Sequence, residues 1–242
     1  MKYIQRAAVF AATVSLIVPA TAHAAPGLGE EVYGAEVEKG EAEVETIYGR
    51  LDGGADDGED VLKLEAAYGV TDRLRLGLIG ELEKEPLQNR RFEAVGVEAI
   101  YELGRVGGVN LAAYGEYEVA FDGADKVETK LLMQRRAGPV DLRLNLIAEK
   151  ELKSGAEVEL GYAASADVET FEEVRLGVQA FGELGTFDHL APRAEHFAGP
   201  VAKVEIEGLG PEMELQAGYL FALGAARDDS DGQFRLALEL EF

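Results

Sequence analysis

The last ten residues of the chain, Gln233–Phe242, alternate strictly between two kinds of side chain. Apolar residues stand at every second position from Phe234 to Phe242, and arginine, alanine and glutamate stand between them. A period of two places successive side chains on opposite faces of a β-strand. One face of this strand would be wholly apolar and the other largely charged, as in a strand that faces lipid on one side and a barrel lumen on the other.

Eleven further segments show a similar alternation, with turn-forming residues between them. Helical periodicity fits poorly: in Val140–Lys150, a period of 3.6 residues would place Asp141 and Arg143 among the leucines. The twelve predicted strands are residues 38–51, 60–70, 73–84, 92–103, 109–121, 126–136, 140–152, 156–167, 172–185, 200–208, 212–223 and 232–242. We therefore predict an all-β fold, a 12-stranded antiparallel transmembrane β-barrel.

The connections between these strands alternate in length. In a barrel with an even strand count both chain ends lie in the periplasm, so the connection after each odd-numbered strand faces outward. Most of the longer connections fall in this outward set, which is 52–59, 85–91, 122–125, 153–155, 186–199 and 224–231. Only 186–199 is long enough to fold into a pore. Residues 29–40 fit either an extension of the first strand or a separate short strand.

The N-terminus has the pattern of an export signal. Lys2 and Arg6 precede an apolar stretch at residues 7–20, and Ala22-His23-Ala24 matches a cleavage site. The apolar stretch is shorter than the roughly 20 residues that a membrane-spanning helix needs. We predict a signal peptide at residues 1–24 and a single barrel domain at residues 25–242.

The charge excludes some classes of function. Loss of the two basic residues in the signal peptide takes the net charge from −23 to −25. Nucleic-acid binding is excluded by this charge, because phosphates need a basic surface. The chain has no cysteine, which excludes a disulfide scaffold and a thiolate zinc site.

Inward positions of the predicted strands are strongly acidic, with a smaller basic set beside them. Rings of carboxylates attract cations, which predicts a passive channel for small cationic or neutral solutes. The candidate selectivity residues are Glu43, Glu65, Glu81, Glu98, Glu116, Glu118, Arg143, Glu149, Glu159, Arg175, Lys203, Glu205, Glu214, Arg235 and Glu239.

The alternative is a non-conducting barrel that serves envelope structure or surface interactions. A 12-stranded barrel is narrow, and long glutamate, arginine and lysine side chains can pair across it and close it. Carboxylates outnumber bases, however, and unpaired buried charges are costly unless they are hydrated. The excess therefore favours a wet lumen, which conduction requires.

Catalysis has little support in the residues. Some 12-stranded barrels are phospholipases that use serine and histidine on the outer face, but no serine here lies on a lipid-facing strand position beside a histidine. The residues concerned are His189, His196, Ser154, Ser165 and Ser230. We expect no catalytic residue, no cofactor and no metal site. A soluble periplasmic β-protein stays open as an alternative, against which the terminal Phe argues.

A hairpin near the N-terminus carries a resemblance to a known group. Tyr68-Gly-Val-Thr-Asp-Arg-Leu-Arg-Leu-Gly-Leu78 resembles the Y-G-[VL]-T-D-x-[LW] hairpin of predicted proteobacterial outer-membrane barrels, which include the meta-pathway phenol-degradation transporter group. The resemblance implies an outer-membrane location in a Gram-negative bacterium and a role in transport. The expected partners are outer-membrane lipid, lipopolysaccharide and the barrel-assembly machinery, which reads a C-terminal strand ending in an aromatic residue such as Phe242.

Overall fold

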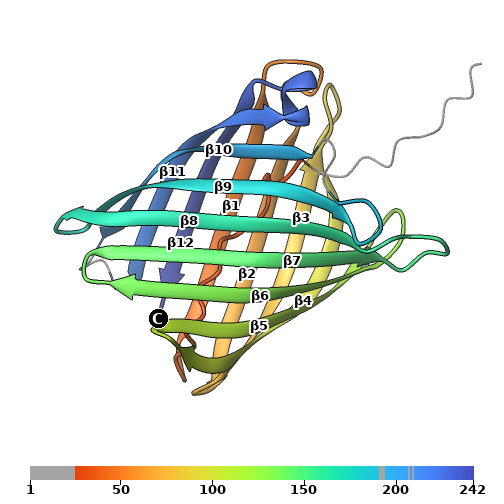
Figure 1. The fold of residues 1–242 in the computed structure, drawn as a ribbon. Helices are drawn as coiled ribbons and strands as arrows, with labels where there is room; N and C mark the ends of the chain where they lie inside the picture. The colour runs from red at the N-terminus through yellow and green to blue at the C-terminus, as the bar shows by residue number, and fades with distance from the viewer. Residues whose placement is uncertain (1–24, 191–193, 207, 209) are drawn as a thin grey trace, which may run out of the picture.

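The computed structural model describes residues 25–190, 194–206, 208 and 210–242, and the predicted signal peptide lies outside these ranges. Twelve antiparallel strands close into one barrel, as the sequence predicts (Figure 1). The strands are β1 (Ala42–Asp52), β2 (Asp60–Thr71), β3 (Leu74–Lys84), β4 (Arg91–Val106), β5 (Val109–Ala120), β6 (Lys126–Ala137), β7 (Val140–Glu151), β8 (Glu159–Phe171), β9 (Val174–Thr186), β10 (Glu195–Ile206), β11 (Glu212–Gly224) and β12 (Gly232–Glu241).

The barrel closes where the first strand meets the last. Thr46 of β1 lies opposite Leu238 of β12, and the same antiparallel register runs along both strands. Beyond the end of β12, the Phe242 amide donates to the Ala42 carbonyl at 2.9 Å. Each strand thus pairs with two neighbours, which leaves no open sheet edge.

The two ends of the barrel differ in their connections. Short hairpins such as 72–73, 107–108 and 138–139 lie at one end, called the hairpin end, together with the C-terminus. Gly107 and Gly108 have φ angles of 60° and 86°, the positive values that a tight two-residue turn needs. Longer loops, among them 53–59 and the segment 225–231 with the short 3₁₀ helix η1 (Ala225–Asp228), lie at the other end, called the loop end.

The prediction for the longest connection was wrong. Strand β10 begins at Glu195 and not at residue 200, because Glu195–Ala198 pair with β11 and His196–Pro200 pair with β9. The connection is therefore shorter than the predicted 186–199, and six of those fourteen residues belong to the strands of the barrel wall instead.

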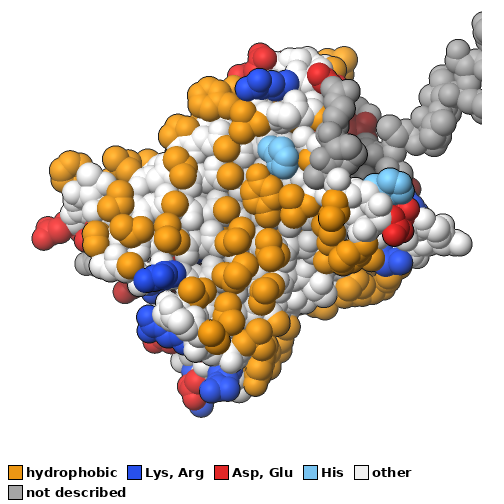
Figure 2. Space-filling model, in the orientation of Figure 1, with side chains coloured by type: hydrophobic (Ala, Val, Ile, Leu, Met, Phe, Trp, Pro, Cys, Tyr) orange, Lys and Arg blue, Asp and Glu red, His pale blue; other side chains and the backbone are white. Residues whose placement is uncertain are grey.

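The barrel wall presents its apolar side chains outward. Along β2, Leu64, Ala66 and Tyr68 are exposed, whereas the alternating residues Lys63, Glu65 and Ala67 are buried inside. Figure 2 shows hydrophobic side chains spread over the wall, with most charged side chains towards its margins. Among the described residues, no helix is long and apolar enough to cross a membrane.

Residues 25–41, called the lumen segment, run through the inside of the barrel. They neither extend β1 before Ala42 nor form a strand of their own, so neither sequence-based option for residues 29–40 was right. Leu28 packs in a buried cluster with Phe181 and Phe197, and Tyr33 packs in a second cluster with Tyr114. The lumen thus contains a small apolar core between its polar ends.

Candidate functional site

Amide side chains of the wall hold the backbone of the lumen segment. Asn145 of β7 accepts a hydrogen bond from the Tyr33 amide at 2.8 Å and donates one to the Tyr33 carbonyl at 3.1 Å. Gln134 of β6 accepts from the Ala35 amide at 3.0 Å, and Gln233 of β12 donates to the Pro26 carbonyl at 2.9 Å. Buried backbone groups need such partners, and here side chains supply what a neighbouring strand would otherwise provide.

Two inward glycines let the segment approach the wall. A Cβ atom on Gly49 of β1 would lie 1.8 Å from the Leu28 carbonyl oxygen, and one on Gly69 of β2 would lie 1.8 Å from the Glu38 carbonyl oxygen. Cβ atoms do not come this close to backbone, so any other residue at either position would displace the segment.

Tyr33 is the centre of the segment's polar contacts. Its hydroxyl lies 3.1 Å from a Glu65 oxygen and 3.0 Å from a Glu98 oxygen, and it accepts a hydrogen bond from the Lys63 ammonium at 3.0 Å. The Lys130 ammonium lies 4.7 Å from the centre of its ring. Tyr33 therefore links the wall strands β2 and β4 through the segment.

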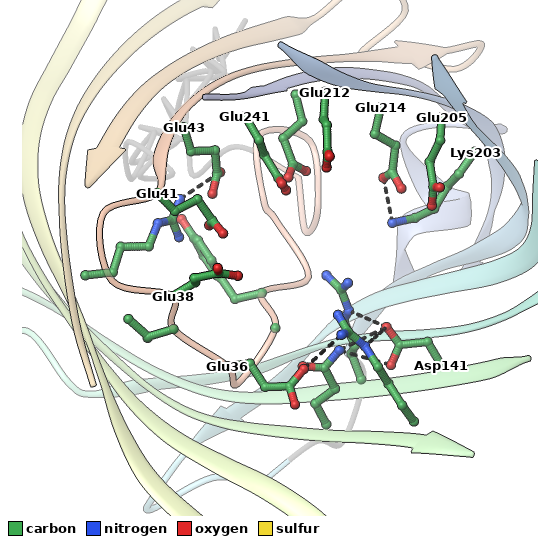
Figure 3. A pocket seen from close by; sticks show the side chains of 18 of the residues that line it. Glu36, Glu38, Glu41, Glu43, Asp141, Lys203, Glu205, Glu212, Glu214 and Glu241 are labelled. Carbon is green, nitrogen blue, oxygen red and sulfur yellow. Dashed lines mark hydrogen bonds and ion pairs between the residues drawn. The ribbon is translucent and has the colours of Figure 1, made fainter. Parts of the chain in front are cut away.

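A cavity opens at each end of the lumen segment. The larger one, at the hairpin end, has a volume of about 820 Å³, and the smaller one, toward the loop end, has about 200 Å³. Figure 3 shows the larger cavity, around which Glu36, Glu38 and Glu41 of the segment face carboxylates of the wall. The Lys203 ammonium, which also lines this cavity, pairs with Glu214 at 2.8 Å.

Carboxylates stand directly opposite one another on successive strands and form two ladders. The first ladder crosses β4 to β8 and consists of Glu98, Glu116, Glu128, Glu149 and Glu159. The second ladder crosses β2, β1, β12, β11 and β10 and consists of Glu65, Glu45, Glu239, Glu214 and Glu205. Side chains in such opposite positions have Cβ atoms about 4.5–5.5 Å apart.

The two ladders together follow the lumen from end to end. Glu159 begins β8 next to the loop end, and Glu205 is close to the finish of β10 at the hairpin end. Glu98 and Glu65, where the ladders come nearest, both contact the Tyr33 hydroxyl. Strands tilt in a barrel, so a row of opposite residues climbs along the axis as it passes around the wall.

Basic side chains compensate part of this charge. Like charges in opposite positions are destabilising, so the ladders need counter-charges, protons or water. Arg75 lies 2.6 Å from Glu65 and 2.7 Å from Glu43, and Lys130 lies 3.0 Å from Glu128. Carboxylates outnumber these partners along both ladders.

The residues singled out from the sequence fall into three groups. Those lining the larger cavity are Glu43, Arg143, Arg175, Lys203, Glu205, Glu214 and Glu239. Those lining the smaller cavity are Glu81, Glu116, Glu118, Glu149 and Glu159. Glu65, Glu98 and Arg235 are buried against the lumen segment or close to it. The contribution of all fifteen to ion selectivity stays a prediction.

Several residues of this lumen were not singled out from the sequence. Glu30, Glu31 and Tyr33 belong to the segment that was expected to be strand, and Glu128 was omitted from an otherwise complete ladder. A usable signal exists for the wall residues: Gln134 and Asn145 are uncharged amides at buried inward positions among charged ones. Such amides are suited to bind backbone.

Glu59, in a loop outside the strands, has a shifted pKa. Burial, and then the nearby charge of Asp56, raises the pKa of Glu59 in the 53–59 loop to about 7 from its ordinary 4.5. A hydrogen bond from the Ala25 backbone amide lowers the pKa and so offsets part of this rise. Glu59 therefore lies beside the start of the lumen segment.

No protein-family profile matches the chain, and no curated protein is similar to it in sequence. Solved structures with a similar fold include the KdgM porin, at 10% identity and a TM-score of 0.56 over 83% of this chain and 99% of the porin. The NanC porin has 7% identity and a TM-score of 0.58 over 82% of this chain and 98% of the porin. An outer membrane channel from Pseudomonas putida F1 has 13% identity and a TM-score of 0.56 over 86% of this chain and 97% of the channel.

These matches and the closed barrel define the class of fold. The chain has the 12-stranded antiparallel β-barrel architecture of outer-membrane porins. At such low identities the likeness concerns the fold, so the function has to be argued from the residues of this lumen.

Proposed function

We propose that this protein is an outer-membrane channel for small cationic or neutral solutes, with the lumen segment controlling the width of the path. The observation that carries the proposal is the pair of carboxylate ladders, which together follow the lumen from the loop end to the hairpin end. Cations can pass between neighbouring carboxylates at this spacing, whereas anions are repelled.

The ladders also bear on the kind of solute. The KdgM porin, which has a similar fold, has been solved in complex with disordered oligogalacturonate. A uronic-acid chain is an anion, and the ladders would oppose its entry here. The transport role implied by the Tyr68–Leu78 hairpin is compatible with the proposal, whereas an acidic sugar polymer as solute is not.

A non-conducting barrel is the second candidate, and the lumen segment itself favours it. Leu28 and Tyr33 are 1% exposed, so the segment fills the middle of the barrel with packed side chains. In this alternative the segment is a permanent plug that stabilises the barrel, and the outer loops carry the function.

Planar-bilayer recordings under a salt gradient separate these candidates. We compare the protein that begins at Ala25 with a variant that lacks residues 25–39 and keeps the whole of β1. We expect stepwise currents with a reversal potential that favours cations, and larger steps in the deletion variant because the middle of the lumen is cleared.

Neutralising both ladders provides the test of selectivity. Replacing Glu116, Glu149, Glu214 and Glu239 by glutamine should move the reversal potential toward zero, while the same change at exposed Glu172 and Glu173 should leave it unchanged. Currents with anion preference, or silence from both the full-length and the deleted protein in their folded forms, would reject the channel.

We further propose that the protein resides in the outer membrane of a Gram-negative bacterium after cleavage behind Ala24. The terminal Phe242, which is 67% exposed, would be read by the barrel-assembly machinery, and lipopolysaccharide would surround the outer rim. In this orientation the loop end faces outward and the hairpin end faces the periplasm. Surface proteolysis of intact cells at the 53–59 loop tests the orientation.

A further inference from the structure

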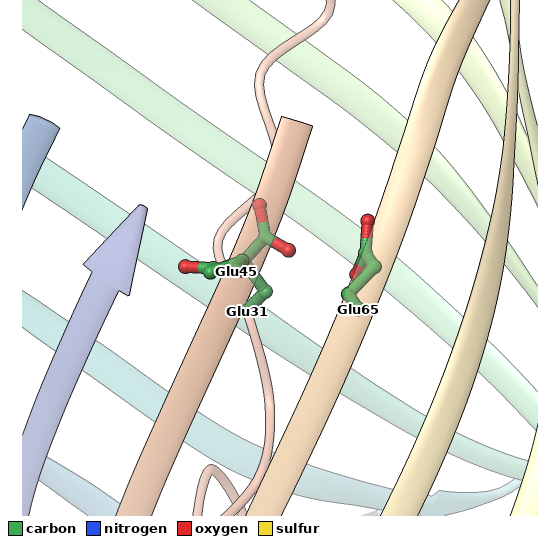
Figure 4. A group of neighbouring side chains, drawn as sticks. All are labelled: Glu31, Glu45 and Glu65. Atoms are coloured by element: carbon green, nitrogen blue, oxygen red, sulfur yellow. The ribbon is translucent and has the colours of Figure 1, made fainter. Parts of the chain in front are cut away.

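Three glutamates converge where the lumen segment crosses the second ladder. Glu31 comes from the lumen segment, Glu45 from β1 and Glu65 from β2, and one carboxylate oxygen of each lies within 4.8 Å of the other two (Figure 4). Glu45 and Glu65 are directly opposite in the strand register. The fold therefore brings together three carboxylates from three separate parts of the chain.

Two of these carboxylates have no ion-pair partner among the described residues. Glu45 is 6% exposed, and its Oε2 atom is buried without a hydrogen-bond partner, as is Oε2 of Glu31. The nearby bases reach Glu65 instead, with Arg75 at 2.6 Å and Lys63 at 3.9 Å. Within the described ranges, no ion pair reaches Glu31 or Glu45.

Arg235 lines a small cavity beside Glu31 and Glu45, but its single charge cannot balance both carboxylates, so the arrangement favours a further positive charge. A buried carboxylate without a partner costs several kcal/mol, and two of them side by side also repel each other. Either protons or a cation must neutralise the pair. A doubly charged cation would balance Glu31 and Glu45 together, while Glu65 supplies a third oxygen ligand.

We propose that Glu31, Glu45 and Glu65 form a binding site for a divalent cation of the calcium or magnesium type. Hard cations of this kind take carboxylate oxygens and water as ligands. A small cavity of about 30 Å³ adjoins Glu31 and Glu45 and has room for about two waters, which would complete the coordination. Arg235 lines the same cavity with unpaired N–H groups, to which these waters could hydrogen-bond.

The site would fasten the lumen segment to the barrel wall. Glu31 is on the segment, whereas Glu45 and Glu65 are on paired strands, so the cation would add to the hydrogen bonds, ion pairs and apolar packing that already join segment and wall. In a conducting barrel, removal of the cation would loosen the segment. That consequence rests on the proposed channel function, but cation binding itself does not.

Calorimetry and thermal unfolding of the detergent-refolded protein test the site. After chelation of divalent ions, calcium or magnesium chloride is titrated into the protein that begins at Ala25. We expect one binding site per chain and a rise in the unfolding temperature. Glu45→Gln should weaken binding by roughly tenfold or more, since the loss of groups that only support a ligand already costs about that much.

The Glu45→Gln variant also distinguishes loss of the cation site from damage to the fold. Without divalent ions, Glu45→Gln should unfold at a higher temperature than the unchanged protein, because it removes an unpaired buried charge. Added calcium should not raise the unfolding temperature of this variant. Glu172→Gln, the same change at an exposed position in the β8–β9 hairpin, should bind calcium like the unchanged protein.

Other outcomes overturn the site. A pH dependence of stability that Glu45→Gln removes, with no effect of calcium or magnesium, would mean that Glu31 and Glu45 share a proton. Unaltered calcium binding in Glu45→Gln would place the ion elsewhere. These measurements need no current. Silent bilayers from both the full-length and the deleted protein, with intact cation binding, would therefore reject only the channel, and a cation-selective current without cation binding would reject only the site.

Discussion

At the scale of single residues, the lumen is organised by side chains that bind backbone. Asn145 pairs with both the amide and the carbonyl of Tyr33, in the way that a residue of a neighbouring strand would. It is fully buried, so neither backbone group has water as a substitute partner. A single side-chain amide therefore satisfies both backbone groups of Tyr33 in the middle of the lumen segment.

Replacement of Asn145 by alanine should loosen the segment and leave the barrel closed. Loss of the partner of a buried backbone group costs about 1–3 kcal/mol, so hydrogen exchange at the Tyr33 amide should rise by roughly tenfold or more. Asn110→Ala is the control, since Asn110 bonds only the exposed Glu36 side chain. Unchanged exchange in the Asn145 variant would show that other contacts hold the segment.

Glu59 should make the stability of the protein depend on pH. This prediction is for a chain that extends at least one residue before Ala25, so that Ala25 has a backbone amide and not a charged α-ammonium. Its pKa is about 7 when folded against an ordinary 4.5, so the folded state holds a proton that the unfolded state has lost. Burial of Glu59 thus costs no stability below pH 4.5, and the loss of stability grows as the pH rises to about 7.

The Glu59→Gln variant measures this effect. Its stability relative to the unchanged protein should rise between pH 4.5 and about 7 and then level off, as unfolding midpoints across this range would show. A chain that begins at Ala25 is the comparison, because its α-ammonium lies beside Glu59 and should lower the pKa and diminish the difference. If the difference in stability between Glu59→Gln and the unchanged protein does not vary with pH, the raised pKa of Glu59 is contradicted.

At the scale of elements, the lumen segment directly precedes β1 in the sequence and packs against it from inside the barrel. Their close approach depends on Gly49, whose missing Cβ leaves room for the Leu28 carbonyl. The segment has little period-two pattern and belongs to no strand, so its position is set by the wall that surrounds it. Its fit against the wall should be sensitive to one methyl group.

Gly49→Ala should displace the segment near Leu28 and increase the conductance in a bilayer. The added Cβ would lie 1.8 Å from a backbone oxygen, and the segment can shift more easily than a paired strand. Gly115→Ala on β5 is a matched control, since a Cβ there meets nothing within 4 Å. Equal conductance of both variants and the unchanged protein, with both barrels folded, would contradict this role of Gly49.

At the scale of the whole molecule, the alternation of faces suits a barrel that sits in lipid. Leu78 of β3 is 64% exposed on the outer wall, although it is a large apolar residue. Its neighbours across the sheet, Ala66 of β2 and Val97 of β4, are also apolar. Such a wall is unfavourable in water and favourable in a bilayer.

A charge on this wall should therefore destabilise the protein in membranes. Leu78→Arg should make folding into liposomes less favourable by about 2–4 kcal/mol, as arginine does near the middle of a bilayer. Leu87→Arg, at a fully exposed loop position, should change it little. Equal stabilities of the two variants in urea titrations would mean that the wall around Leu78 does not face lipid.

The sequence by itself determined the strand count, the two faces of each strand and the acidic character of the lumen. These features depend on local alternation, which any strand in any sheet converts into two faces. Positions such as Glu116 and Glu214 could thus be assigned to the inside without knowledge of their neighbours. The same pattern misplaced the start of β10, because the pairing of Glu195–Ala198 is decided by the adjoining strands.

Only the tertiary structure decided the path of residues 25–41 and the contacts that follow from it. The segment has little alternation, and its backbone partners on β6, β7 and β12 lie far away in the sequence. The ladders likewise depend on the register between strands, which barrel closure sets for all twelve together. Glu31 meets Glu45 and Glu65 for that reason: the wall fixes two of the carboxylates, and the packed segment brings the third to them.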